Sequence, residues 1–290
     1  MIRKGIILAG GIGSRLSPVT KSVNKQLLPV YNKPLIFYSL SILLQNNIKN
    51  ILIIVSKGQT NHFKKILPIN NNLGIKIKYL EQKKPKGLPE AFIIGRNFIK
   101  NDKVALILGD NIFLSKNYSN IIFNNSKFSS GAKIFLCSVK NPKMFGVAKI
   151  NTKKKVVEIE EKPSTPKSNL AITGLYLFDK NVIKYSKSLK PSKRNELEIV
   201  DLLKIYKLKK YLNADILNKN IKWFDAGSVD DLLLASNFIK NIEKKKKIIT
   251  GCLEQIAYKK KWINSNKIKK SIKFYGKCNY SNYLKKIIKK

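Results

Sequence analysis

The apolar residues in the first part of the chain follow two kinds of pattern, one typical of strands and one typical of helices. Short continuous apolar runs and one alternating segment predict strands, at residues 6–8, 51–55, 75–80 and 104–108. Apolar residues at helical spacing predict helices between them, at 35–43, 60–67 and 90–99. Asn32-Lys33-Pro34 precedes the first of these helices. This supports the predicted helix start, because proline is favoured there. This order predicts a parallel sheet with helices packed on its faces.

The pattern changes in the second half of the chain. Further strands are expected at 133–139, 147–150, 156–159 and 172–178, with few helices between them, so the sheet should be mixed. After Phe238 the sequence becomes rich in lysine and mostly helical in pattern. We therefore expect a main α/β domain at 1–240 and a lysine-rich C-terminal helical appendage at 241–290.

Composition limits the class of protein. With 290 residues, 43% of them hydrophobic, the chain can bury a large core. No segment approaches the roughly 20 apolar residues of a membrane span, and the apolar run near the start is too short for a signal peptide. The three cysteines lie far apart and His62 is the single histidine, so no zinc-ligand spacing occurs. These features predict a cytoplasmic protein without contact to a membrane.

The formal net charge of +41 raises the question of nucleic-acid binding. Lysine is spread along almost the whole chain together with asparagine and isoleucine, without the clustered basic and aromatic pattern of a nucleic-acid arm. We interpret most of it as solvated surface and expect no specific nucleic acid as a partner. The lysine clusters at 244–247, 259–261 and 285–290 leave weak, salt-screened polyanion contacts open.

The first predicted strand runs into a glycine-rich loop that contains Gly10, Gly11 and Gly13. Such a loop can present backbone N–H groups to phosphate, although its spacing matches neither the dinucleotide fingerprint nor the P-loop. A tight turn without a ligand is the alternative. Arg15 favours an anion site, because a guanidinium suits phosphate.

Two aspartates are candidates for a metal pair. Asp110 follows the strand at 104–108 and a glycine, where Mg²⁺ ligands are placed in phosphoryl-transfer enzymes. An N-cap of the next helix is the alternative for a lone aspartate. Asp225 precedes a helix that Ser228 and Asp231 can cap, which leaves the Asp225 carboxylate free.

Lys25 and Lys162 stand in apolar or proline-framed surroundings at expected strand or turn ends. In so basic a chain, solvated surface lysine is the alternative for both. Glu160 and Glu161 adjoin Lys162 in a chain with only 17 acidic residues.

With these motifs in view, the chain resembles the sugar-nucleotide pyrophosphorylases over nearly its whole length, and within them the thymidylyltransferase branch. The ordered motifs that carry the resemblance lie at residues 5–16, 25–30, 32–34, 87–88, 108–111, 159–163, 167–169, 173–176, 196–199 and 223–228. The resemblance implies a Rossmann-like nucleotidyltransferase fold with a mixed, mostly parallel central sheet flanked by helices. It also implies transfer of dTMP from dTTP to α-D-glucose 1-phosphate with Mg²⁺, release of pyrophosphate, and no covalent enzyme intermediate.

The resemblance further implies a homotetramer that serves deoxysugar synthesis of the dTDP-rhamnose type and cell-surface polysaccharide. It assigns the five catalytic roles to Arg15, Lys25, Asp110, Lys162 and Asp225, with the two aspartates on the metal. It implies substrate contacts, from the triphosphate loop through the thymine pocket to the sugar phosphate, at Leu8, Gly10, Gly11, Gly13, Gln82, Pro85, Gly87, Leu88, Gly146, Glu161, Lys162, Thr173, Gly174, Arg194 and Trp223.

The chain departs from the family at several positions. Phe145 replaces a tyrosine, which predicts looser sugar selection, and Pro89-Glu90 replaces Ala-Gln. Leu114-Ser115-Lys116 replaces Tyr-Gly-His beside a secondary nucleotide site that the family links to feedback by a dTDP-sugar, which argues against regulation by dTDP-rhamnose. The segment 251–258 still resembles the other side of that site, so complete loss is not implied.

Two other functions stay open at this point. A sister enzyme that uses UTP or another sugar 1-phosphate would keep the same phosphate and metal residues. A basic polyanion-binding protein on a degenerate scaffold would be favoured if one of the five catalytic residues were missing, and all five are present.

Overall fold

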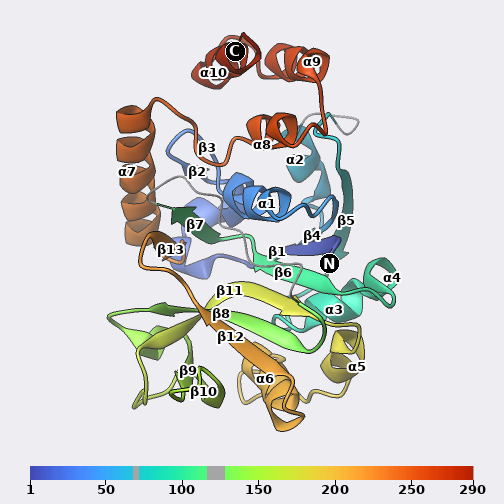
Figure 1. Cartoon of the computed structure of the whole chain (residues 1–290), viewed down its shortest axis with the longest axis vertical. Helices are drawn as coiled ribbons and strands as arrows, with labels where there is room; N and C mark the ends of the chain where they lie inside the picture. The colour runs from blue at the N-terminus through green and yellow to red at the C-terminus, as the bar shows by residue number, and fades with distance from the viewer. Residues whose placement is uncertain (68–71, 116–127, 290) are drawn as a thin grey trace.

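The computed structural model describes residues 1–67, 72–115 and 128–289 (Figure 1). Its centre is a nine-stranded sheet in the order β10-β9-β11-β6-β1-β4-β5, with β8 beside β11 and β12 beside β8. The strands are β1 (Lys4–Ala9), β4 (Asn50–Ser56), β5 (Lys76–Gln82), β6 (Val104–Leu108), β8 (Ala132–Ser138), β9 (Gly146–Ile150), β10 (Val156–Glu161), β11 (Leu170–Phe178) and β12 (Leu212–Ile216).

The sheet is mixed, as the sequence predicts. Strand β1 pairs in parallel with β4 and β6, and β4 pairs in parallel with β5. Strand β11 runs antiparallel to β6, β8 and β9, whereas β12 pairs with β8 in parallel. The continuous apolar runs form the parallel half because strands covered on both faces by helices need apolar side chains on both faces.

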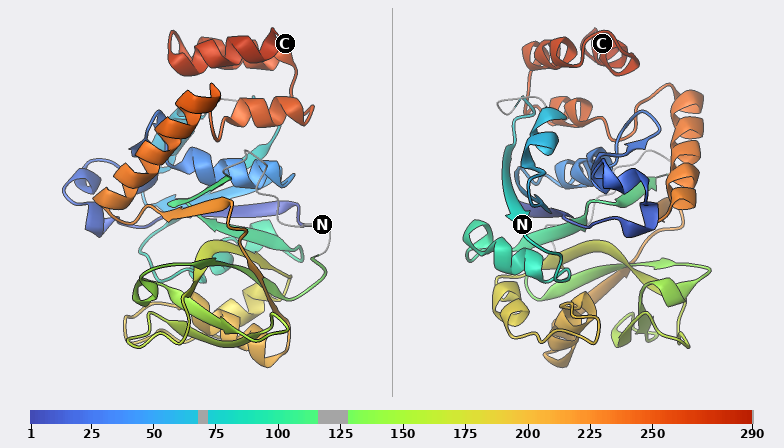
Figure 2. Two further views of the ribbon diagram at one scale, coloured as in Figure 1. Left: turned by 60° about the vertical axis from the view of Figure 1, so that its left-hand side comes forward. Right: turned by 180° about the vertical axis from the view of Figure 1, so that it is seen from behind.

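Helices cover both faces of the sheet (Figures 1 and 2). Ile6 and Ile7 are both fully buried but belong to opposite hydrophobic clusters, because successive strand residues point to opposite faces. One cluster joins α1, α2 and α8 to the sheet, and the other joins α3, α5 and α6. The helices of the main domain are α1 (Ile36–Gln45), α2 (Thr60–Lys65), α3 (Glu90–Ile94), α4 (Arg96–Ile99), α5 (Val182–Lys187) and α6 (Ile199–Leu208).

One helix expected from the sequence, at 90–99, is divided in the structure. It consists of α3 and α4, which meet at Gly95. A Cβ at Gly95 would lie 2.9 Å from the Ala91 carbonyl oxygen and 3.1 Å from the Leu52 side chain. Glycine therefore allows close approach of this corner to β4, and the helical pattern alone does not reveal the division.

Two small sheets complete the main domain, and neither was expected from the sequence. Strand β2 (Pro29–Val30) pairs with β3 (Lys33–Pro34), and β7 (Asn111–Ser115) pairs with β13 (Ile221–Asp225). Both pairs are antiparallel. The second pair sets Asp225 opposite Asn111 and so brings residues from two distant parts of the chain to one edge of the molecule.

The C-terminal part is helical, as the sequence predicts. Helix α7 (Val229–Lys246) starts at Ser228, whose hydroxyl accepts a hydrogen bond from the Asp231 backbone N–H at 3.2 Å. Helix α8 (Leu253–Lys259) packs on α1, while α9 (Ser265–Tyr275) and α10 (Asn279–Ile288) pack on each other at one end of the molecule (Figure 1). Helix α7 passes through residue 240, so the boundary between 1–240 and 241–290 stays a prediction.

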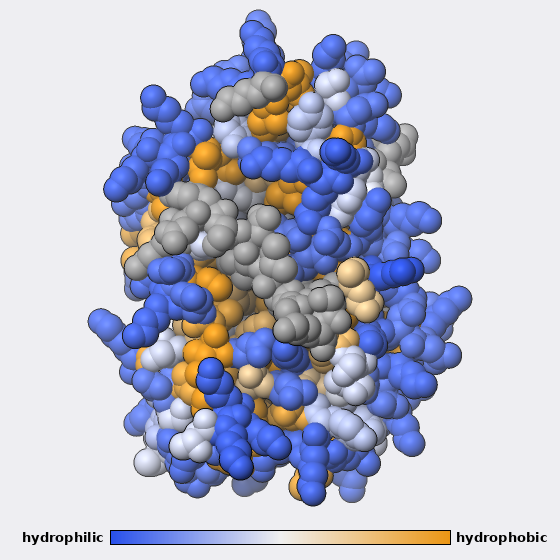
Figure 3. All heavy atoms as spheres, viewed as in Figure 1, coloured by the Kyte–Doolittle hydropathy of each residue, from blue (hydrophilic) through white to orange (hydrophobic). Residues whose placement is uncertain are grey.

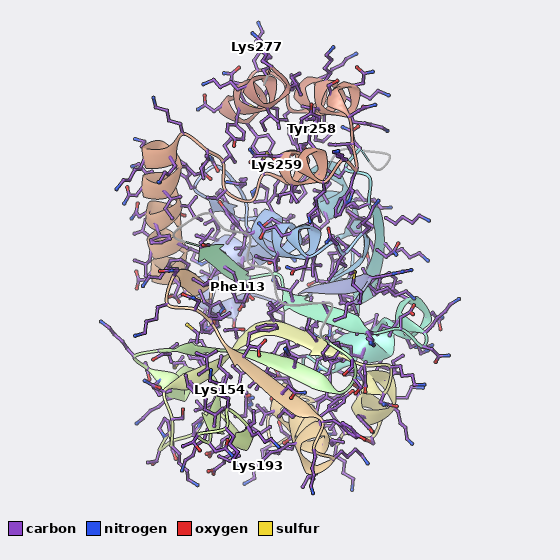
Figure 4. The ribbon with its side chains drawn as sticks, viewed as in Figure 1. Phe113, Lys154, Lys193, Tyr258, Lys259 and Lys277 are labelled. Carbon is purple, nitrogen blue, oxygen red and sulfur yellow. The ribbon has the colours of Figure 1, made fainter. Side chains whose placement is uncertain are left out.

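Much of the charge lies on the surface. Hydrophilic residues cover most of the described surface on the face in Figure 3, and Lys154, Lys193 and Lys277 extend away from the ribbon in Figure 4. All three are exposed. Among the described residues, no helix is both long and apolar enough to cross a bilayer.

Candidate active site

A cavity of about 450 Å³ lies at the carboxyl ends of β1, β5 and β6, where ligands bind in open α/β sheets. Most of the substrate and catalytic residues expected from the sequence line it: Leu8, Gly11, Arg15, Gln82, Pro85, Gly87, Leu88, Asp110, Gly146, Glu161, Lys162, Gly174, Arg194, Trp223 and Asp225. Four expected residues, Gly10, Gly13, Lys25 and Thr173, are not part of the lining. Thr173 is fully buried beside Gly174.

The two aspartates lie at neighbouring strand ends. Asp110 follows β6 after Gly109, and its carbonyl oxygen accepts a hydrogen bond from the Ala226 N–H at 3.0 Å, which draws Asp225 to it. Strand β7 begins at the next residue, so Asp110 does not act as a helix N-cap. Burial, and next the Asp110 charge, raise the pKa of Asp225 to about 6, while Lys25 and Arg15 oppose that shift.

The two expected cations approach the aspartates from the loop side. Lys25 is buried in the short 3₁₀ helix Lys25–Leu27, which Asn24 caps, and its Nζ lies 2.6 Å from Asp110 Oδ2. Arg15 lies in the 3₁₀ helix Ser14–Leu16 and packs against Gly227. A Cβ at Gly227 would come within 2.7 Å of the guanidinium, so glycine allows the arginine to lie next to Asp225.

Asn111 holds these parts together, and sequence reasoning missed this role. Its side chain is buried, and Oδ1 accepts hydrogen bonds from the Gly174 N–H at 3.0 Å and from Trp223 Nε1 at 2.6 Å. Its Nδ2 donates to Asp110 Oδ1 at 3.0 Å. One amide thus fixes the orientation of the Asp110 carboxylate and of β11 and β13 around it. The sequence Gly109-Asp110-Asn111 marks the place but not the partners.

On another wall of the cavity, Arg194 lies between two glutamates. Arg194 donates to Glu198 at 2.8 and 3.2 Å and to Glu161 at 3.3 Å. Burial raises the pKa of Glu161, and the Glu198 charge raises it further. Lys162 is exposed at the rim, and its backbone φ of 45° turns the chain there. Glu198 was not expected as part of the site, because its role depends on a contact with Arg194 that only the folded loop creates.

An aromatic pair lies between the two charged walls. The Phe145 and Trp223 rings have centroids 5.2 Å apart, and both side chains line the cavity. Phe145 therefore lies in the site. It lacks the hydroxyl of the tyrosine that the family carries at this position.

A loop after β5 forms the remaining wall. Gly87 has φ of 97° and pairs with Leu197, and a Cβ there would lie 2.0 Å from the Leu197 carbonyl oxygen. Only glycine fits this close approach. Leu88 and the buried Gln82 side chain lie beside it on the cavity wall.

A second cavity of about 510 Å³ lies between α1, β7 and the segment before α8. It is lined by Leu114 and Ser115 on one side and by Gly251 and Gln255 on the other, so the two segments singled out in the sequence do meet. Lys116 lies outside the described residues. Leu114 is only 6% exposed and packs in a hydrophobic cluster with Val30 and Tyr38.

The carboxylates suit a magnesium ion. Mg²⁺ is usually held by one or two carboxylates together with substrate phosphates, and Asp110 and Asp225 supply such a pair. Burial and, next to it, the Asp110 charge raise the pKa of Asp225, and a bound cation would offset both effects. Within the described ranges, no group of three or more His, Cys, Asp or Glu side chains forms a larger metal cluster.

Comparisons with known proteins agree with this geometry. A family model described as nucleotidyl transferase matches residues 4–242. The chain therefore belongs to the nucleotidyl transferase family, and it is a nucleotidyltransferase enzyme. It is 42% identical over 287 residues to a protein of Neisseria meningitidis named glucose-1-phosphate thymidylyltransferase, covering 99% of this chain and 100% of the relative.

Two solved structures have a fold similar to that of this chain. A Bacillus anthracis structure, described as a candidate glucose-1-phosphate thymidylyltransferase in complex with a sucrose, is 42% identical with a TM-score of 0.73, over 81% of this chain and 94% of that one. A UDP-glucose pyrophosphorylase complexed with UDP-glucose is 25% identical with a TM-score of 0.75, over 83% of this chain and 99% of that one.

Proposed function

We propose that the protein is a glucose-1-phosphate thymidylyltransferase that transfers dTMP from dTTP to α-D-glucose 1-phosphate and releases pyrophosphate. The observation that carries the proposal is one cavity with cations on both sides of the space for the substrates. Arg15 lines it near the aspartate pair, with Lys25 behind Asp110 in an ion pair, and Lys162 and Arg194 line it on the other side. The names of full-length relatives support the same activity.

The cations answer an electrostatic need. Each pair of unit charges 4 Å apart interacts with about 1 kcal/mol in water and about 4 kcal/mol at an effective dielectric constant near 20. A sugar phosphate that attacks a triphosphate brings several such pairs together. Lys25 and Arg15 would hold the triphosphate, and the loop amides of Gly11 and Gly13 would add N–H donors.

On the opposite wall, Lys162 and Arg194 would bind the phosphate of glucose 1-phosphate and direct one of its oxygens at the α-phosphorus. That oxygen forms the new bond while the bond to pyrophosphate breaks, so no covalent enzyme intermediate and no general base are needed. Gly146, Glu161 and Gly174 would line the glucose, and Gln82, Gly87 and Leu88 would receive the base.

Asp110 and Asp225 would hold Mg²⁺, which, when bound, neutralises charge on the triphosphate and on the leaving pyrophosphate. Lys25 keeps the Asp110 carboxylate in place through their ion pair. Asn111 fixes the other oxygen of the same carboxylate.

We also propose that the enzyme is a cytoplasmic homotetramer that serves deoxysugar synthesis. Feedback regulation at the second cavity would be weakened. The replacement of the family's aromatic and histidine residues at 114–116 supports the last point.

The test is product identification. The purified protein with Mg²⁺, dTTP and glucose 1-phosphate should form equal amounts of dTDP-glucose and pyrophosphate, detected by chromatography and mass spectrometry. A product from UTP alone would move the protein to the sister activity. No product with either nucleotide would refute the proposed reaction.

A further inference from the structure

The Gln82 side chain is held by a partner that the proposed reaction has not used. Gln82 is the last residue of β5 and is 4% exposed. Its Nε2 donates to Glu90 Oε2 at 2.5 Å, and the same oxygen accepts from the Lys86 backbone N–H at 3.1 Å. Glu90 is the first residue of α3, which begins three residues after Gly87.

This contact decides which way the Gln82 amide points. A carboxylate accepts hydrogen bonds and donates none, so only the NH₂ end of the amide can face Glu90. The opposite orientation would set two acceptor oxygens against each other. Glu90 therefore removes the ambiguity that a glutamine amide otherwise has.

The carbonyl end of Gln82 is then directed toward the nucleotide loop. A Cβ at Gly10 would lie 2.4 Å from Gln82 Oε1, so this oxygen lies against the backbone just after β1. Gln82 also lines the active-site cavity. The hydrogen bond that fixes the Gln82 side chain is donated by Nε2, so Oε1 at the other end of the amide can accept from a ligand in the cavity.

We propose that Glu90 is a positioning residue for base selection: it fixes the Gln82 amide so that an acceptor oxygen, not an NH₂ group, faces the nucleotide base. The proposal rests on the proposed function, in which Gln82 reads the base. Thymine and uracil carry a hydrogen on N3 and can donate it to this oxygen. Cytosine has a lone pair on N3, which the same oxygen repels. Glu90 thereby favours triphosphates of bases with an N3–H group.

The test compares kcat/KM for dTTP and dCTP, each with glucose 1-phosphate, in the wild type and in Glu90→Ala. The alanine removes the acceptor of the hydrogen bond from Gln82 Nε2, so the Gln82 amide is free to turn. We expect the dTTP to dCTP ratio to fall about tenfold, which corresponds to about 1.4 kcal/mol. The KM for glucose 1-phosphate should stay unchanged.

The chain offers a matched control in Glu81→Ala. Glu81 precedes Gln82 on β5, but its carboxylate accepts from the Thr60 hydroxyl at 2.8 Å, whereas the Gln82 amide donates to Glu90. This variant removes the same charge, so its dTTP to dCTP ratio should remain that of the wild type. A purely structural role of Glu90 would lower activity with both nucleotides equally and leave the ratio intact.

An unchanged ratio in folded Glu90→Ala would overturn the inference, and so would a wild-type enzyme without preference for dTTP over dCTP. If Glu90→Ala does not fold, Glu90→Leu provides the second variant, since it also leaves Nε2 of Gln82 without its partner. If the wild type uses none of dTTP, UTP and dCTP, the proposed function fails first, and the inference with it.

Discussion

Lys25 Nζ lies 2.6 Å from Asp110 Oδ2, and the lysine side chain is only 6% exposed. A nearly buried cation next to a proposed metal ligand is an unusual use of lysine in a chain whose lysines are mostly on the surface. The contact joins the loop after the first strand to the end of β6, which is where the triphosphate would bind.

Lys25→Ala should therefore reduce kcat more strongly than it lowers the stability of the fold. It removes a cation from the transition state and leaves Asp110 without its partner, so we expect a loss on the order of 100-fold in kcat. Steady-state pyrophosphate release measures it. Lys21→Ala is the control, because Lys21 is an exposed lysine four residues earlier. Equal losses in both variants would contradict a specific role of Lys25.

Lys162→Ala should act on the sugar-phosphate side. We expect the KM for glucose 1-phosphate to rise about tenfold or more, with a smaller change in the KM for dTTP, because a charge-assisted hydrogen bond to phosphate contributes about 1.5–3 kcal/mol. Initial rates at varied concentrations of each substrate separate the two. Lys155→Ala, an exposed lysine in the turn before β10, should leave both constants unchanged. Normal kinetics in Lys162→Ala would exclude the role.

Gly87→Ala should cost both stability and nucleotide binding. Gly87 has φ of 97° and no room for a Cβ, whereas Gly58 has φ of 78° and no atom within 4 Å of the position that a Cβ would take. Gly58→Ala thus carries only the backbone strain of the left-handed region, about 1 kcal/mol. Urea unfolding and dTTP titration of both variants give the comparison. Similar behaviour of the two would show that the contact with Leu197 is unimportant.

Glu254 predicts a pH dependence of stability. It is fully buried in α8, and burial raises the pKa of its carboxyl above 4.5, against the hydrogen bond from the Tyr280 hydroxyl at 2.6 Å. The folded state holds this proton to a higher pH than the unfolded state does. Its contribution to stability is therefore present below about pH 4.5 and is lost as pH rises through the folded pKa.

Glu254→Gln removes that ionisation while keeping the shape. As the pH rises from about 4.5 through the folded pKa of Glu254, the variant should lose less stability in urea unfolding than the wild type does. Glu160→Gln, which removes the same charge from an exposed position, should follow the wild type. A variant curve parallel to that of the wild type would refute the titration of Glu254.

The sequence predicts the parallel half of the sheet well because each buried strand is a local apolar run. The runs at 51–55 and 104–108 coincide with β4 and β6. It does not predict β7 and β13, since their pairing joins segments more than 100 residues apart and neither carries a clear period. Strand β12 is also missed, because its residues are largely exposed and partly polar and so form no apolar run.

The candidate site shows a similar division. Motifs locate the residues that would touch substrate, such as Arg15 and Asp225, because these stand beside glycines or strand ends. The groups that position them are not visible in the sequence. Asn111 acts through a hydrogen bond to Trp223, 112 residues away in the chain. Glu198 and Glu90 bond residues only four and eight positions away, but these contacts depend on the loop conformations of the folded chain.

The most direct test of the proposed reaction is pyrophosphate release by the wild type and by Asp110→Asn, with Mg²⁺, glucose 1-phosphate and either dTTP or UTP. Asp230→Asn, an exposed aspartate at the start of α7, is the control. We expect rapid release with dTTP in the wild type and in Asp230→Asn, and almost none in Asp110→Asn. Full activity of Asp110→Asn, or no release with dTTP in the wild type, would contradict metal-assisted thymidylyl transfer at this site.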